Sequence, residues 1–84
     1  MTQVIWTAPA QRDLRRLDLR TAERIRAAVR RYADLGHGDV AKLQGPDEEY
    51  RLRVGDYRAI FQFESGRIVV IVLRVRHRRE AYRG

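Results

Sequence analysis

The stretch that decides the fold of this chain is Tyr50-Arg51-Leu52-Arg53-Val54-Gly55-Asp56-Tyr57-Arg58-Ala59-Ile60-Phe61. Its first five residues alternate between apolar and charged, which is the pattern of a strand with one buried face. Gly55-Asp56 is a two-residue turn with glycine first, and this suits a type II′ hairpin. The stretch therefore predicts two antiparallel strands joined by a tight turn.

This turn also predicts which side chains share a face of the hairpin. It places Arg53 opposite Arg58, on the face that also carries Arg51, and opposed residues on antiparallel strands lie on the same side of a sheet. The other face carries Tyr50, Leu52, Ala59 and Phe61. Two opposed arginines repel each other, and no acidic residue of these two strands lies beside them. The arrangement indicates a site for an external anion such as phosphate; the alternative is that the side chains extend into water.

The segments on either side of the hairpin predict two helices and further strands. Residues 3–7 are rich in β-branched and aromatic side chains and predict a short strand. Apolar residues then recur at helical spacing in two segments, with Thr7 and Thr21 as N-caps and Gly36 as a left-handed C-cap. After a turn at Ser65-Gly66, the apolar run 68–75 predicts a central strand covered on both faces. We expect a single α+β domain over residues 1–84 with the order β-α-α-β-β-β, a mainly antiparallel sheet, two helices on one face and a short turn or helix at 78–83.

Charge is concentrated in the second half of the chain. The formal net charge is +7, and residues 51–84 hold nine Arg against three acidic residues, a net of +6. A field of one sign favours a polyanionic partner such as nucleic acid or an acidic protein. The alternative is arginine-rich codon usage, which accounts for the single lysine but not for the imbalance between the halves.

The amino-acid composition argues against several other classes of protein. The absence of cysteine removes disulfides and thiolate chemistry. The longest apolar run has six residues, Ile68–Leu73, and no signal peptide precedes the first strand, so we expect a cytoplasmic protein without a membrane segment. With two histidines and no clustered carboxylates, no metal or other cofactor is expected.

His77 is a candidate for proton transfer, because a histidine can exchange a proton near neutral pH. If Ser65-Gly66 closes the second hairpin, the odd-numbered residues of 69–77 share the face of Arg53 and Arg58, and His77 emerges near that pair. A longer loop would place these residues on the opposite face.

Three segments carry a resemblance to a known family: Lys42-Leu43-Gln44-Gly45, the Tyr50–Phe61 stretch, and His77-Arg78-Arg79-Glu80-Ala81-Tyr82-Arg83. They are similar to the RelE branch of the RelE/ParE toxin superfamily, and the resemblance covers essentially the whole chain. It implies the β-α-α-β-β-β fold and the toxin of a type II toxin–antitoxin pair. It further implies cleavage of mRNA, usually in the ribosomal A site, without a metal.

The resemblance also implies roles for individual residues. Arg51 and Arg53 stand at two basic positions of the family, Arg58 at its phosphate-stabilising arginine, Arg78 at a C-terminal basic catalytic residue and Tyr82 at a C-terminal tyrosine. Both paired positions are arginine where well-known members often have lysine, which makes them poor proton acceptors. The predicted catalytic set is Arg53, Arg58, His77, Arg78 and Tyr82, and the predicted RNA contacts are Lys42, Arg51, Arg76 and Arg79. Tyr82 either stacks on a base or anchors the tail on the sheet edge.

The implied partners are the ribosome with its mRNA and a cognate acidic antitoxin, joined to the toxin in a hetero-oligomer. Such an antitoxin is expected to fold a flexible segment over the basic surface. The alternative within the superfamily is a ParE-like toxin that inhibits DNA gyrase and catalyses nothing. A third interpretation is a basic RNA-binding module without toxicity.

Overall fold

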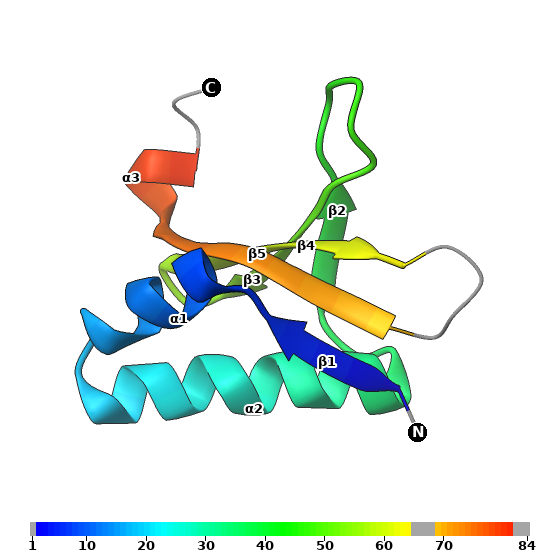
Figure 1. Cartoon of the computed structure of the whole chain (residues 1–84). Helices are drawn as coiled ribbons and strands as arrows, with labels where there is room; N and C mark the ends of the chain where they lie inside the picture. Colours follow the sequence, from blue (N-terminus) through cyan, green and yellow to red (C-terminus); the bar gives the residue numbers. More distant parts are fainter. Residues whose placement is uncertain (1, 65–68, 82–84) are drawn as a thin grey trace.

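The computed structural model describes residues 2–64 and 69–81. The elements are β1 (Gln3–Trp6), α1 (Ala8–Arg15), α2 (Leu19–Leu35), β2 (Asp39–Lys42), β3 (Tyr50–Val54), β4 (Tyr57–Phe63), β5 (Val69–His77) and α3 (Arg78–Ala81). The strands form one sheet in the order β1-β5-β4-β3-β2, in which β1 is parallel to β5 and the other pairs are antiparallel. Helix α2 runs along one face of the sheet, and α3 lies on the opposite side at the end of β5 (Figure 1). The predicted α+β fold with two helices on one face is confirmed.

The helices begin and end at residues that satisfy their free backbone groups. Thr7 caps α1 by accepting a hydrogen bond from the Ala10 N–H at 3.3 Å. Asp18 is the N-cap of α2 and accepts from the Thr21 N–H at 3.2 Å, so the prediction of Thr21 as the cap is wrong. An aspartate caps at least as well as a threonine, and helix formation therefore starts three residues earlier. Gly36 ends α2 with φ 73°, as predicted.

The hydrophobic core lies between the two helices and the sheet. Helix α2 contributes Ala22, Ile25 and Val29, the stripe that its helical spacing predicts. Apart from Ile25, the largest fully buried side chains of the core come from the sheet: Leu52, Phe61, Val70 and Val72. Burying each such side chain stabilises the fold by roughly 1.5–3 kcal/mol, which fixes the helix face of β3, β4 and β5.

The register of the β3–β4 hairpin is the one predicted from its turn. Arg53 pairs with Arg58, and Gly55 takes the left-handed conformation that the tight turn requires, with φ 59°. Strand β5 is an interior strand, as its apolar run predicts. Strand β2 was not predicted, and it adds a fifth strand beside β3. The predicted turn at Ser65-Gly66 lies outside the described residues.

An irregularity in β5 changes which of its residues face the helices. Ile60 pairs with Arg74 and the next residue, Phe61, pairs with Val72, so Leu73 is an extra residue on β5. Such a β-bulge shifts the alternation of side chains by one position. As a result Val75 and His77 lie on the helix side, while Arg76 lies on the side of Arg58.

Within the described residues, no helix combines the length and the apolar composition needed to cross a membrane.

Candidate nucleic-acid interface

One face of the sheet, turned away from α1 and α2, carries a transverse row of arginines. Arg53 on β3 pairs with Arg58 on β4, and Arg58 pairs with Arg76 on β5. Neighbouring strands lie about 4.8 Å apart, so the three side chains leave the sheet side by side. Arg51 leaves the same face from β3. We call the surface formed by Arg51, Arg53, Arg58 and Arg76 the arginine face.

The arginines of this face differ in their exposure. The side chain of Arg53 is 57% exposed, whereas Arg58 as a residue is 5% exposed. The Arg58 guanidinium donates from Nη1 to the carbonyl oxygens of Gly55 at 3.1 Å and Tyr57 at 3.0 Å. Arg53 therefore presents its charge to solvent, while Arg58 braces the β3–β4 turn.

The same turn holds Arg78. Its backbone N–H donates to the Asp56 carbonyl at 2.7 Å, and its Nε lies 3.9 Å from the Asp56 carboxylate. Three consecutive carbonyls, those of residues 55 to 57, thus receive hydrogen bonds from Arg58 and Arg78. The hairpin turn brings together two arginines that are twenty positions apart in the sequence.

Asp39 on β2 supplies an acidic neighbour that the sequence analysis did not place there. It pairs with Arg53 across the sheet, and its two carboxylate oxygens lie 3.7 Å from Arg51 and 3.9 Å from Arg53. The expectation that the repulsion between Arg53 and Arg58 has no local compensation is wrong. It failed because the compensating carboxylate lies on a strand outside the predicted hairpin.

His77 does not join the arginine face, and its predicted position beside Arg53 and Arg58 is wrong. The extra residue in β5 turns it to the helix side, where it pairs with Tyr57 and the two rings meet edge to face with centroids 5.4 Å apart. Its Nδ1 lies 3.3 Å from the Arg79 N–H, which donates to it. His77, Tyr57 and Asp13 line a small cavity of about 160 Å³ beneath the end of α1.

The other predicted site residues lie apart from the row. Lys42 pairs with Tyr50, so it belongs to the helix side of the sheet, although it is exposed. Arg79 is exposed on α3. Tyr82 lies outside the described residues. The structure thus gathers Arg51, Arg53, Arg58 and Arg76 on one face, with Arg78 at the adjoining turn.

Asp13 organises the edge of β5 next to this site, and no sequence signal pointed to it. It is 9% exposed and accepts hydrogen bonds from Arg74 Nε at 2.8 Å, Arg74 Nη2 at 3.1 Å and the Val75 N–H at 2.8 Å. Burial by itself would raise the pKa of Asp13. The hydrogen bonds from Arg74 and Val75 and the charges of Arg74 and Arg76 outweigh burial, so the pKa lies below its ordinary value. The carboxylate thereby turns Arg74 toward the sheet edge.

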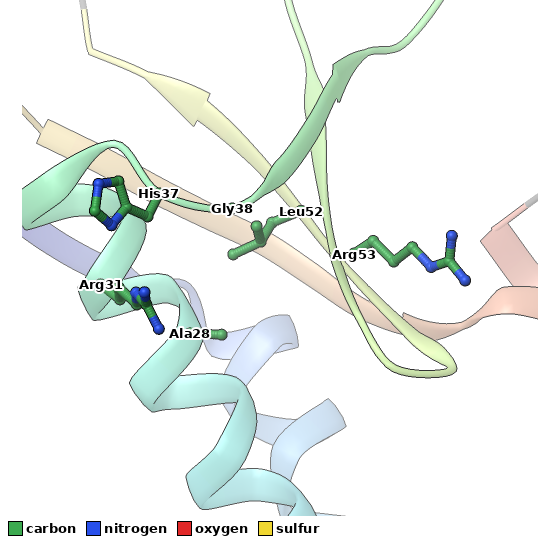
Figure 2. A pocket seen from close by; sticks show the side chains of 6 residues that line it. All are labelled: Ala28, Arg31, His37, Gly38, Leu52 and Arg53. Carbon is green, nitrogen blue, oxygen red and sulfur yellow. The ribbon is translucent and has the colours of Figure 1, made fainter.

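A second cavity near the site lies between α2 and β3. A cavity of about 330 Å³ is lined by Ala28, Arg31, His37, Gly38, Leu52 and Arg53. Figure 2 shows Leu52 pointing toward α2 while its neighbour Arg53 points away from the other lining side chains. The exposed guanidinium is therefore directed out of this cavity, as expected for adjacent residues of a strand. Among residues 2–64 and 69–81, no three His, Asp or Glu side chains gather where they could hold a metal ion.

Solved structures with a similar fold include isolated toxins and antitoxin–toxin complexes. The RelB–RelE antitoxin–toxin complex from Methanococcus jannaschii matches with a TM-score of 0.74 at 23% identity, over 94% of this chain and 95% of that one. The RelBE2 toxin–antitoxin complex from Mycobacterium tuberculosis matches with a TM-score of 0.67 at 27% identity, over 90% and 96%. The isolated RelE toxin of E. coli matches with a TM-score of 0.73 at 18% identity, over 92% and 84%. No curated protein sequence matches the chain.

The sequence assigns the chain to a family within this class. Residues 4–82 match the model of the ParE toxin of type II toxin–antitoxin system, parDE. The chain belongs to this toxin family, within the RelE/ParE superfamily that its resemblance indicated.

Proposed function

We propose that this toxin cleaves mRNA at the ribosome without a metal and uses the arginine face to hold the scissile phosphate. The observation that carries the proposal is the row formed by Arg53, Arg58 and Arg76 on three adjacent strands. Guanidinium groups bind phosphate oxygens in pairs, and a row of them fits a polyanionic backbone.

RNA supplies its own nucleophile in this reaction. The 2′-OH beside the scissile phosphate gives its proton to a water molecule and forms a bond to phosphorus. The bond from phosphorus to the 5′-oxygen breaks, and that oxygen takes a proton from water. The products are a 2′,3′-cyclic phosphate and a 5′-OH end. The protein's part is to stabilise negative charge on the non-bridging oxygens and to hold the attacking and leaving oxygens in line.

In this proposal the exposed Arg53 makes the first contact with the phosphate. Arg58 adds its charge from the position opposite Arg53 and keeps the β3–β4 turn in place. Arg78 on α3, whose backbone is hydrogen-bonded to the same turn, adds a further positive charge. His77 lies on the other face, so these arginines provide charge and position rather than proton transfer. Cleavage of free RNA should therefore be slow, and the ribosome would supply the alignment that accelerates it.

We also propose a small acidic antitoxin as the partner that silences the arginine face. The relatives from M. jannaschii and M. tuberculosis are antitoxin–toxin complexes. A net charge of +7 favours an acidic segment that folds as it binds. The affinity should fall as salt rises, because exposed charges are screened. An affinity that stays constant from low to moderate salt would contradict the electrostatic part of this proposal.

The test of the activity is to add the purified toxin to translating ribosomes and map the ends of the mRNA. We expect breaks within codons in the A site. Arg53→Ala should reduce their rate about 100-fold or more, as loss of one charge-stabilising contact typically does. Arg20→Ala, which removes an equal charge from an exposed position on α2, should leave the rate unchanged. Intact mRNA together with inhibited supercoiling by gyrase would instead favour the gyrase-directed alternative.

A further inference from the structure

We propose that Asp39 is an internal counter-ion of the arginine face, which competes with phosphate for Arg51 and Arg53 and so sets the affinity of this face for RNA. The RNA part of this inference rests on the proposed function. The competition for an anion does not, because it follows from the charges alone.

The geometry places one carboxylate between two guanidiniums. Asp39 Oδ1 lies 3.7 Å from Arg51 Nη1, and Asp39 Oδ2 lies 3.9 Å from Arg53 Nη1. The backbone of Asp39 also accepts a hydrogen bond from Arg51 Nη1 at 3.4 Å. Each carboxylate oxygen therefore lies nearest to a different arginine of the face.

The contact is of the kind that an incoming anion can displace. Charge-assisted hydrogen bonds from guanidinium to carboxylate measure about 2.7–2.9 Å, so both distances describe attraction of charges without a formed hydrogen bond. The Asp39 side chain is 56% exposed, and exposed pairs of this kind are weak. Phosphate oxygens bind guanidinium in the same way as carboxylate oxygens and can form the short bonds that Asp39 does not. A phosphate thus displaces the Asp39 carboxylate from the two arginines. To do so it must compete with a carboxylate that the fold holds beside Arg51 and Arg53 at all times.

The position of Asp39 is not explained by the strand it occupies. Aspartate is unfavourable in strands, and β2 is held to β3 by backbone pairing that needs no side-chain charge. What Asp39 does offer is relief of the repulsion between Arg53 and Arg58, which are opposed across the sheet. Removing its charge should therefore have two opposite effects: the free protein becomes slightly less stable, while the arginine face binds anions more tightly. A residue with a structural role alone would show only the first.

The test compares Asp39→Asn with Asp34→Asn, a matched control that also removes one negative charge. Asp34 on α2 lies 3.8 Å from Arg30 Nη1 in an equally loose pair, away from the arginine face. The probe is a short single-stranded RNA whose 2′-oxygens are methylated so that it cannot be cleaved, and its binding is measured by fluorescence anisotropy. We expect Asp39→Asn to bind about three- to tenfold more tightly than the parent at low salt. Asp34→Asn should change the affinity less than about twofold, and the advantage of Asp39→Asn should shrink at high salt.

Equal affinities for the two variants would overturn the inference. Weaker binding by Asp39→Asn would overturn it as well, and would show instead that the carboxylate holds the arginines in their binding positions. A second probe separates this inference from the proposed function: pyrophosphate is titrated while the Nε–H signals of the arginines are followed by NMR. If the parent neither cleaves mRNA nor binds the RNA probe, the proposed function fails. A lower dissociation constant for pyrophosphate in Asp39→Asn would still support the role of Asp39, and an unchanged one would refute it.

Discussion

Replacing Asp13 with alanine should be among the most costly single changes near the arginine face. The Asp13 carboxylate is nearly buried and accepts three hydrogen bonds, two from the Arg74 guanidinium and one from the Val75 N–H. The β1–β5 pairing ends at Trp6 and Val72, so Asp13 takes the place of a neighbouring strand at the edge of β5. Alanine would leave the Val75 N–H buried without an acceptor.

The expected loss follows from these contacts. An unsatisfied buried backbone donor costs about 1–3 kcal/mol. The contact to Arg74 adds less than a buried ion pair, about 1 kcal/mol, because the Arg74 side chain is 41% exposed. We therefore expect Asp13→Ala to lower the free energy of unfolding by about 2–4 kcal/mol. In a domain of this size, that corresponds to a fall of about 10–25 °C in Tm. Asp13→Asn keeps an oxygen for the Val75 N–H and should lose about half as much.

The assay is urea unfolding at pH 7, followed by the fluorescence of Trp6, the single tryptophan of the chain, which packs partly buried against the core. Asp34→Ala is the control, because it breaks an exposed pair with Arg30 and should cost less than about 0.5 kcal/mol. A loss below about 1 kcal/mol in Asp13→Ala would refute the view that this carboxylate completes the edge of β5.

Two further predictions concern the stability of the fold at low pH and the replacement of two glycines by alanine. The pKa of Asp13 is lower in the folded protein than its ordinary value of 3.8, so its stabilisation is present above that value and is lost as the pH falls below it. The difference in unfolding free energy between the parent and Asp13→Asn should shrink between pH 5 and pH 2, and a constant difference would contradict this. Gly38→Ala should destabilise by about 1–3 kcal/mol, because a Cβ there would lie 2.6 Å from Leu52 Cδ1 at a φ of 156°. Gly36→Ala, with open space around it and φ 73°, should cost only about 1 kcal/mol in the same urea titration, and equal losses would argue against the clash.

The local parts of the fold were predictable because their causes are local. The alternation in residues 50–54 and the Gly55-Asp56 turn determine the hairpin register, and with it the opposition of Arg53 and Arg58. The apolar spacing along α2 determines which of its residues are buried. Side chains within a few positions of one another decide these features, so the sequence alone is sufficient.

Strand β2 and the cap of α2 were missed for different reasons. Residues 39–42 form a segment too short to give a strand signal by itself, and its first residue is an aspartate, which is unfavourable in strands. Pairing with β3 makes these residues a strand. At α2 the choice between Asp18 and Thr21 is a competition between two good caps, and the observed bond runs from Thr21 to Asp18.

The amino-acid sequence by itself determined the family, the α+β architecture and the concentration of positive charge in the second half of the chain. Only the tertiary structure decided how that charge is arranged. An extra residue at Leu73 turned His77 away from the arginines and brought Arg76 beside Arg58, and a strand from another part of the chain placed Asp39 between Arg51 and Arg53. The physical reason is that a bulge and an edge strand form only when distant segments pair, and their free energy comes from contacts that no local pattern contains.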